Sequence, residues 1–175
     1  FAASLASLFS KSKITGKVSD GYGTITEILE NTTIQGVKCL NSQLIKPIIS
    51  SSDKTLSGYS TSLSFDGNLS TAWYGDSKKG YPYSIIFDLD AITCVEGIEI
   101  SIPQSATPVE LVLETSILDN LPFTKISSYN INSNSLNLIQ FNATKARFVK
   151  VTENSGNNLY GGISEIKILA SPVVR

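Results

Sequence analysis

The stretch 64–73 reads Ser64-Phe65-Asp66-Gly67-Asn68-Leu69-Ser70-Thr71-Ala72-Trp73. Its centre is typical of a tight loop, because Gly67 can adopt the positive φ that such a turn requires. A loop of this kind gathers one carboxylate and several backbone carbonyls around a common point, which is how proteins hold a hard cation such as calcium. Thr71 adds an oxygen from the returning chain, and Trp73, the only tryptophan, begins the next segment.

The chain beyond this loop carries a strong β-strand pattern. Apolar residues recur at every second position around 84–90, 98–102 and 109–114. Further segments of the same character lie at 123–131, 136–141, 147–151 and 163–169. Short alternating strands separated by turn residues are typical of an all-β sandwich or barrel, and no long helix is expected among them.

Composition excludes several functions for the 175-residue chain. Its 14 basic and 15 acidic residues nearly cancel, whereas nucleic acids and anionic membranes need a clustered positive field. Histidine is absent, which rules out serine–histidine and cysteine–histidine catalysis within this chain. The sequence also lacks a glycine-rich phosphate loop and any apolar stretch long enough to cross a membrane.

Six further segments follow the loop in a recognisable order: YSIIFDL at 83–89, VEGIEI at 95–100, LETS at 113–116, PF at 122–123, ARFVKV at 146–151 and GISEI at 162–166. Together with the loop they resemble the coagulation factor 5/8 C-terminal (discoidin) family and its relatives among galactose-binding-like carbohydrate modules. The resemblance covers about 43–170. It implies a discoidin-like jelly-roll β-sandwich of eight strands, with ligand-binding loops at one end.

The resemblance also implies a structural calcium ion under the first long loop. Its ligands would be the carboxylates of Asp66 and Glu165, the hydroxyl or carbonyl of Thr71, and backbone carbonyls of Asn68 and of Ser64 or Phe65. The position of Glu165 agrees with this, since Ile166 and Ile168 can face the core while Glu165 lies on the opposite strand face. The alternative is that Asp66 only caps its own turn and Glu165 is a solvated edge residue.

Two departures from the family pattern narrow the expected ligand. Clotting-factor-like members close the domain with cysteines near both ends, whereas this chain has Cys39 and Cys94. These two cysteines are either a disulfide or two buried thiols, and the sequence leaves both open. The usual sugar-binding histidine is missing, so galactose recognition through that residue is not expected. We therefore favour the carbohydrate modules over the lipid-binding members.

Sugars bind where an aromatic face meets planar hydrogen-bonding groups, and two loops offer that mixture. The expected contacts are Tyr160, Asn157 and Asn158 in one loop, Tyr74 and Tyr81 in the other, and Tyr59 nearby. Each has a plain alternative, because tyrosines at loop ends often cover the core. Trp73 is expected to be buried, and Arg147 is expected to form a structural ion pair.

We divide the chain into an N-terminal arm or extension, 1–42, and a sandwich domain, 43–171. The predicted function is a non-catalytic, lectin-like module that binds a glycan or glycoprotein outside the cell or on its surface. The alternative is a protein-interaction domain of an adhesive assembly, in which the arm contacts other copies of the chain or a neighbouring surface protein. A start at Phe1 without methionine is consistent with a removed signal peptide or an excised fragment.

Overall fold

The computed structural model describes residues 39–52, 54–107, 109–118, 122–132, 134–156 and 159–171, without the side chains of Ile49 and Ser50. The described strands are β1 (Gln43–Ile45), β2 (Ile49–Ser51), β3 (Trp73–Tyr74), β4 (Tyr83–Ser101), β5 (Val109–Ser116), β6 (Thr124–Ile131), β7 (Asn137–Gly156), β8 (Gly162–Ile163) and β9 (Glu165–Ala170). A short 3-10 helix, η3, spans Thr61–Ser64. None of the described residues forms a helix long and apolar enough to span a membrane.

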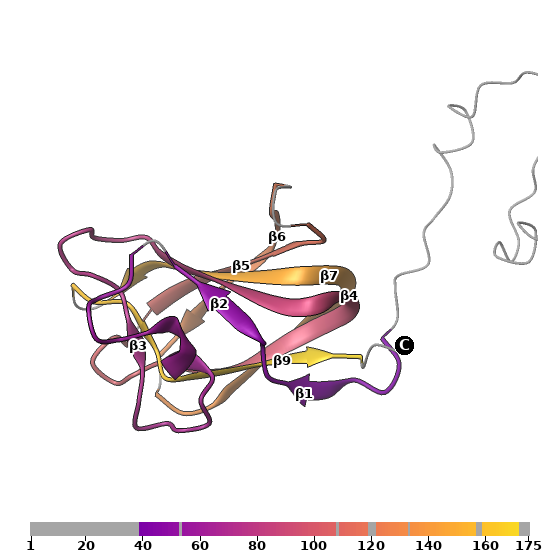
Figure 1. Ribbon diagram of the computed structural model, residues 1–175, viewed down its shortest axis with the longest axis horizontal. Coiled ribbons are helices and arrows are strands. Elements are labelled where there is room, and N and C mark those ends of the chain that lie inside the picture. The colour runs from indigo at the N-terminus through magenta and orange to yellow at the C-terminus, as the bar shows by residue number, and fades with distance from the viewer. Residues whose placement is uncertain are drawn as a thin grey trace, which may run out of the picture. The chain divides into compact units, whose positions relative to one another are not determined.

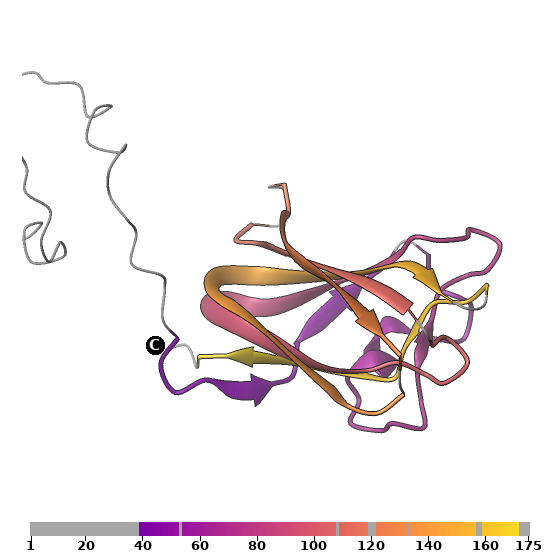
Figure 2. The ribbon, with the colours of Figure 1, turned by 180° about the vertical axis from the view of Figure 1, so that it is seen from behind.

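Two long strands, β4 and β7, belong to both layers of the sandwich. They pair antiparallel along most of their length, and the register shifts between Asp88 and Thr93. On one side of this shift, β2 pairs with β4 while β5 and β6 extend the sheet from β7. On the other side, β9 and then β1 extend the sheet from β4. Figures 1 and 2 show β4 and β7 curling together at the end away from β3, so one continuous sheet folds over itself.

The predicted alternation places the core correctly. Ile85, Phe87 and Leu89 are buried, as are Ile98 and Ile100 further along β4 and Ile102 just after its end. Trp73 is 0% exposed, and its indole Nε1–H donates to the hydroxyl of Thr55 over 3.0 Å, which confirms its predicted core position. The fold is thus the all-β sandwich that the sequence predicts.

The strand count and boundaries differ from the prediction. The segments 84–90 and 98–102 belong to one strand, β4, except for Ile102, and 136–141 and 147–151 belong to one strand, β7, except for Leu136. Asp90 allows β4 to continue through its bend by adopting a φ of +70°, a conformation that aspartate tolerates better than most residues. Seven strands form the bent sheet, and β3 and β8 form a separate two-stranded sheet. The described residues therefore contain nine strands, whereas eight were expected.

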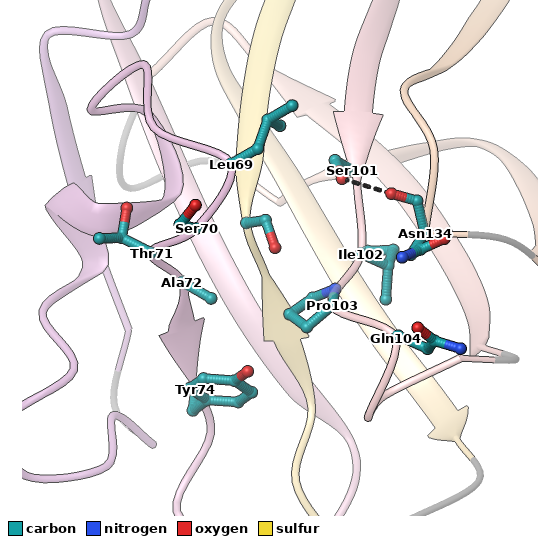
Figure 3. Close-up of a pocket in the computed structure, with 11 residues that line it drawn as sticks. Leu69, Ser70, Thr71, Ala72, Tyr74, Ser101, Ile102, Pro103, Gln104 and Asn134 are labelled. Carbon is teal, nitrogen blue, oxygen red and sulfur yellow. Dashed lines mark hydrogen bonds between the residues drawn. The ribbon is translucent and has the colours of Figure 1, made fainter.

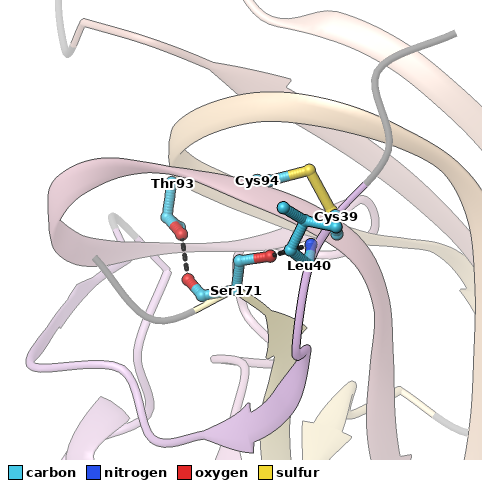
Figure 4. The surroundings of a disulfide bond; sticks show 5 residues. All are labelled: Cys39, Leu40, Thr93, Cys94 and Ser171. Carbon is cyan, nitrogen blue, oxygen red and sulfur yellow. Dashed lines mark hydrogen bonds between the residues drawn. A yellow bond between two sulfur atoms is a disulfide. The ribbon is translucent and has the colours of Figure 1, made fainter. Parts of the chain in front are cut away.

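A disulfide between Cys39 and Cys94 joins the beginning of the described chain to β4, with 5.4 Å between the Cα atoms. This observation decides between the two alternatives that the sequence left open. Ser171 joins the same region, because its hydroxyl accepts the Leu40 N–H over 2.9 Å and its carbonyl accepts the Thr93 hydroxyl (Figure 4). Both ends of the described chain are therefore held at the middle of β4.

Arg147 forms the predicted structural ion pair. Its Nε and Nη2 atoms donate to the two carboxylate oxygens of Asp88, each over 2.8 Å, across neighbouring strands β7 and β4. The guanidinium group holds the pKa of Asp88 below its ordinary value, chiefly through these hydrogen bonds. Arg147 thus braces the bend of the two long strands.

The proposed division at residue 42 remains a prediction. All nine described strands lie within the predicted domain 43–171, and Cys39 lies just before it. The N-terminal arm or extension predicted for 1–42 falls almost entirely outside the described residues.

Candidate functional site

The 64–71 loop closes on itself through the Asp66 carboxylate. Asp66 Oδ1 accepts the Asn68 N–H over 2.8 Å, and Oδ2 lies 2.7 Å from the Thr71 hydroxyl. The same hydroxyl lies 2.8 Å from the Asn68 carbonyl oxygen. Gly67 has a φ of +87°, as the tight turn requires. The loop therefore gathers the oxygens of Asp66, Asn68 and Thr71 at one place, and Asp66 does cap its own turn.

Glu165 reaches this loop from the first position of β9. Its side chain is only 2% exposed, so it is not the solvated edge residue of the alternative interpretation. Oε2 accepts the Gly67 N–H over 2.9 Å, whereas Oε1 is buried and has no hydrogen-bond partner among the described residues. A buried acceptor without a partner is energetically costly, so a further hydrogen-bond donor or a cation next to this oxygen would be favourable.

The chemistry of this oxygen cluster fits a hard cation, although its carboxylates are few. The described residues contain no group of three or more His, Cys, Asp or Glu side chains that could hold a metal. Any cation would therefore depend on neutral oxygens in addition to Asp66 and Glu165. The Ser64 hydroxyl is already committed to the Thr61 carbonyl over 2.7 Å, and the Phe65 ring packs edge-on against Phe87.

A lysine side chain lies close to the same loop. A Cβ atom added at Gly67 would come within 2.9 Å of the Lys46 ammonium nitrogen. Lys46 is exposed, and its flexible side chain places an ammonium group next to the turn at Gly67. This group supplies positive charge beside Asp66 and Glu165.

Tyr59 and Tyr74 come together at the loop-bearing end of the sandwich. Their rings meet edge to face, with 5.1 Å between centroids. Tyr74 pairs with Gly162 in the small β3–β8 sheet, where a Cβ atom added to the glycine would lie 2.9 Å from the Tyr74 ring. The absence of a side chain at Gly162 thus leaves room for the Tyr74 ring.

Tyr81 lies in the same region but is partly buried. Its hydroxyl donates to the Tyr160 carbonyl over 3.3 Å, and its ring packs against Tyr83 with 4.7 Å between centroids. Burial, followed by the nearby Glu153 and Tyr83, raises the pKa of Tyr81 to about 12. The Tyr160 side chain is 41% exposed. Asn157 and Asn158, the other predicted contacts of this loop, lie outside the described residues.

A cavity of about 370 Å³ lies between the 69–74 segment and the end of β4. Figure 3 shows Tyr74, Thr71 and Ala72 on one side and Ile102, Pro103, Gln104 and Asn134 on the other. Ser101 contributes a hydroxyl that donates to the Asn134 carbonyl over 3.0 Å. The volume is within the range of about 300–1,000 Å³ usual for small-molecule sites. Apolar surface and uncharged hydrogen-bonding groups therefore meet in one concave place.

Sequence analysis singled out Tyr74 as a ligand contact and Thr71 as a calcium ligand, but it missed the residues of the opposite wall of the cavity. Gln104 comes shortly after the end of β4, and Asn134 comes shortly before the beginning of β7. The two residues come together because the end of β4 pairs with the beginning of β7. A usable signal was the Ile-Pro-Gln break at 102–104, because a proline directly after an alternating strand marks where the strand ends and a loop begins.

Glu153 is a second buried carboxyl that the sequence analysis missed. It is 1% exposed on β7, and both of its oxygens approach the Gly162 N–H, at 3.2 and 2.9 Å. Burial raises its pKa from the ordinary 4.5 to about 8. A Cβ atom added at Gly161 would lie 2.2 Å from its Oε2, so this carboxyl packs directly under the segment that carries Tyr160.

The F5/8 type C domain model matches residues 47–166, which is more than half of the chain. The chain belongs to the F5/8 type C family. The match confirms the resemblance predicted from the loop and the six segments after it. Membership also agrees with the bent two-layer sheet and the loops gathered beside β3.

Solved structures similar to this F5/8 type C domain include several carbohydrate-binding modules. The CBM32 of AlyQ, in complex with 4,5-unsaturated mannuronic acid, is 22% identical, with a TM-score of 0.65 over 73% of this chain and 98% of its own. CpGH89CBM32-5 from Clostridium perfringens, in complex with GalNAc-beta-1,3-galactose, is 23% identical, with a TM-score of 0.63 over 70% of this chain and 94% of its own.

The family 32 module of C. perfringens NanJ, in complex with galactose, is 19% identical, with a TM-score of 0.62 over 69% of this chain and 91% of its own. At identities this low, the TM-scores establish only that the fold is shared. The comparison with curated proteins gives no match.

Proposed function

We propose that this F5/8 type C domain is a non-catalytic carbohydrate-binding module. The observation that carries the proposal is the cavity beside Tyr74, which combines an aromatic ring with the amide groups of Gln104 and Asn134. Aromatic rings pack against the C–H groups of sugars, while amides can both donate to and accept from sugar hydroxyls. The arrangement on a rigid sandwich limits the entropy lost on binding.

Tyr160 and Tyr59 extend the proposed surface. Tyr160 precedes Gly162, the partner of Tyr74, by two residues, and Tyr59 contacts Tyr74 directly. The proposal draws support from the solved modules of similar fold, several of which are complexes with sugars. In this proposal Tyr81 acts mainly as a support, because its hydroxyl is bonded to the Tyr160 backbone.

The non-catalytic part of the proposal rests on the chemistry of the cavity wall. The described residues that line it include no carboxylate, lysine or arginine, and the chain contains no histidine. General acid–base catalysis needs a titratable group within hydrogen-bonding reach of the substrate. An extracellular or cell-surface location is supported by the Cys39–Cys94 disulfide, since such bonds persist in oxidising compartments.

We further propose that a structural calcium ion occupies the loop between Asp66 and Glu165. The two carboxylates and the oxygens of Thr71 and Asn68 would hold it, with the carbonyl of Ser64 or Phe65 completing the set. The buried and unpartnered Oε1 of Glu165 favours this site. A bound ion would fix the 64–71 loop, and with it the Thr71 wall of the cavity.

Calcium is expected to stabilise the native chain. A ligand that binds only the folded state adds about 2.7 kcal/mol when present at about a hundred times its Kd. Chelation should therefore lower the melting temperature by roughly 5–10 °C for a domain of this size. The measurement is thermal unfolding of the full chain in calcium and in EDTA.

Asp66→Asn should abolish the difference between calcium and EDTA by removing one anionic ligand. Asp90→Asn provides a matched control, because Asp90 is exposed on β4 and asparagine accepts its positive φ. The control should keep the full difference. Superimposable melting curves of the unaltered chain in calcium and EDTA would contradict the proposed metal site.

Tyr74→Ala and Tyr160→Ala are each expected to weaken glycan binding at least tenfold. A single shallow site should bind with a Kd of about 0.1–1 mM, so a loss of about 1.4 kcal/mol moves binding beyond easy detection. The measurement is a titration of the full chain with a glycan panel, followed by amide chemical shifts in NMR spectra. Tyr160→Ala should leave the melting temperature nearly unchanged, because its side chain is substantially exposed.

Ile92→Ala serves as the control, since it removes an exposed apolar side chain from the bent end of β4. It should leave affinity unchanged. If the shifts persist in Tyr74→Ala, the cavity is not the binding site. If a broad glycan panel moves no resonance around Tyr74 or Tyr160, the carbohydrate proposal fails.

The alternative function, a protein-interaction domain with a self-associating N-terminal arm, stays a prediction. Residues 1–38, on which it rests, lie outside the described part of the chain.

A further inference from the structure

The described residues that line the cavity offer hydrogen-bonding groups but carry no charge. Besides Tyr74, its polar side chains are the hydroxyls of four residues and the amides of two: Ser70, Thr71, Ser101, Ser164, Gln104 and Asn134. The remaining lining residues are apolar. Such groups match the hydroxyl and amide groups of a sugar, and they supply no countercharge to a ligand that carries one.

A negative charge lies directly behind one wall. Thr71 faces the cavity, and its hydroxyl lies 2.7 Å from Oδ2 of Asp66. A carboxylate or sulfate entering the cavity would thus approach an anion of the same sign. If the proposed calcium ion is bound, the two carboxylates of Asp66 and Glu165 balance its charge, so the wall stays close to neutral.

The described lysines at this end of the domain do not line the cavity. The Lys46 ammonium lies beside Gly67 in the 64–71 loop, where it offsets part of the charge of Asp66 and Glu165. The Lys54 ammonium donates to the carbonyls of Gly80 and Pro82, over 3.2 and 2.8 Å. Lys78 and Lys79 are exposed on the following turn, and neither lines the cavity. An acidic sugar would therefore lose hydration at its carboxylate without gaining an ionic partner, which is unfavourable in a partly enclosed site.

We infer that the cavity selects uncharged sugar units and discriminates against glycans whose units carry carboxylates or sulfates. The inference rests on the proposed carbohydrate-binding function and specifies its ligand class. The fold alone does not decide this point, because modules of similar fold are seen with 4,5-unsaturated mannuronic acid and with galactose. In this chain the uncharged side chains that line the cavity favour neutral sugars over acidic ones.

The test compares two ligands that differ only at C6. Oligosaccharides of α-linked galactose are titrated into the full chain beside α-linked galacturonic acid oligosaccharides of the same length and linkage. Neutral gluco- and manno-oligosaccharides and their uronic acid counterparts extend the panel to other ring stereochemistries. We expect at least one neutral ligand to give saturable amide shifts around Tyr74 and Gln104, and its acidic counterpart to bind at least tenfold more weakly.

A change of a single side chain should largely remove the discrimination. Gln104 is exposed, so Gln104→Arg adds a guanidinium at the cavity mouth without disturbing the core. The variant should bind the acidic ligand within about threefold of its neutral counterpart, whereas Gln104→Glu, the matched control, should not bind it. Charge-assisted bidentate bonds to a carboxylate provide the reason.

The outcomes separate the two proposals. Equal or tighter binding of the acidic ligand by the unaltered chain overturns this inference and leaves the carbohydrate function standing. Neutral ligands that shift only resonances around Tyr81 also overturn it, because the cavity is then not the site. If no ligand of either class shifts any resonance, the carbohydrate function itself fails.

Discussion

Glu153→Gln is expected to make the chain more stable at pH 9 than the unaltered sequence. Burial raises the pKa of Glu153 from its ordinary value of 4.5, which holds in the unfolded chain, to about 8 in the folded one. Between these values the folded state binds one more proton than the unfolded state. The free energy of unfolding therefore falls as pH rises through this window.

The size of the effect follows from the same shift. At about 1.4 kcal/mol for each pKa unit, the loss is on the order of 5 kcal/mol once the pH exceeds 8. Glutamine resembles the protonated carboxyl in shape and keeps an oxygen that can accept the Gly162 N–H. The variant should consequently lack this pH-dependent loss, while its stability near pH 5 should stay within about 1 kcal/mol of the unaltered chain.

Urea unfolding between pH 5 and 9 measures this dependence. Glu110→Gln on β5 is the control, because Glu110 is only partly buried and its replacement should leave the steep loss in place. Tyr81 and Tyr83 interact with the same carboxyl, and because their pKa values are raised both phenols stay neutral as Glu153 titrates. A Glu153→Gln variant with the same pH dependence as the unaltered chain would show that the carboxyl is not held neutral by burial.

Removal of the Cys39–Cys94 disulfide should lower stability by about 4 kcal/mol. The two cysteines are 55 residues apart in sequence, and closing a loop of that length restricts the unfolded chain by roughly this amount. The double variant Cys39→Ala/Cys94→Ala avoids a free thiol. Chemical unfolding of the variant and of the oxidised chain gives the difference directly.

Reduction of the unaltered chain provides the control for that experiment. It should destabilise the chain by a similar amount and should have no further effect on the double variant. The strands β1 and β9 still pair in the absence of the bond, so a folded but weaker sandwich is expected. Equal stability of the double variant and the oxidised chain would mean that the bond contributes nothing to the free energy of unfolding.

The sequence predicted the core well because strand alternation reports burial directly. Ile85, Phe87 and Leu89 recur at every second position, and all three are buried on one face of β4. The alternation did not reveal that β4 continues through Asp90, since an aspartate at this point is equally typical of a turn that ends a strand.

Alternation in β7 also indicated that Glu153 is buried, although the sequence analysis did not single it out. Val149, Val151 and Glu153 share one face of β7, and all three are buried. A carboxyl in phase with two core valines was therefore recognisable from the sequence as a buried titratable group.

The cavity could be predicted only in part. Tyr74 ends β3 and begins a segment, 74–83, that is rich in aromatic and polar residues, and that composition drew attention to it. Gln104 and Asn134 are thirty positions apart in ordinary-looking turns, and only the pairing of β4 with β7 places them together. Their role depends on topology, which a single sequence does not specify at this detail.

The most direct test of the central claim is a crystal structure of the full chain with the glycan that binds it most tightly in solution. We expect one sugar ring against Tyr74, with its hydroxyls within hydrogen-bonding distance of Gln104 or Asn134. A glycan bound elsewhere on the sandwich, with the cavity occupied only by solvent, would contradict the account.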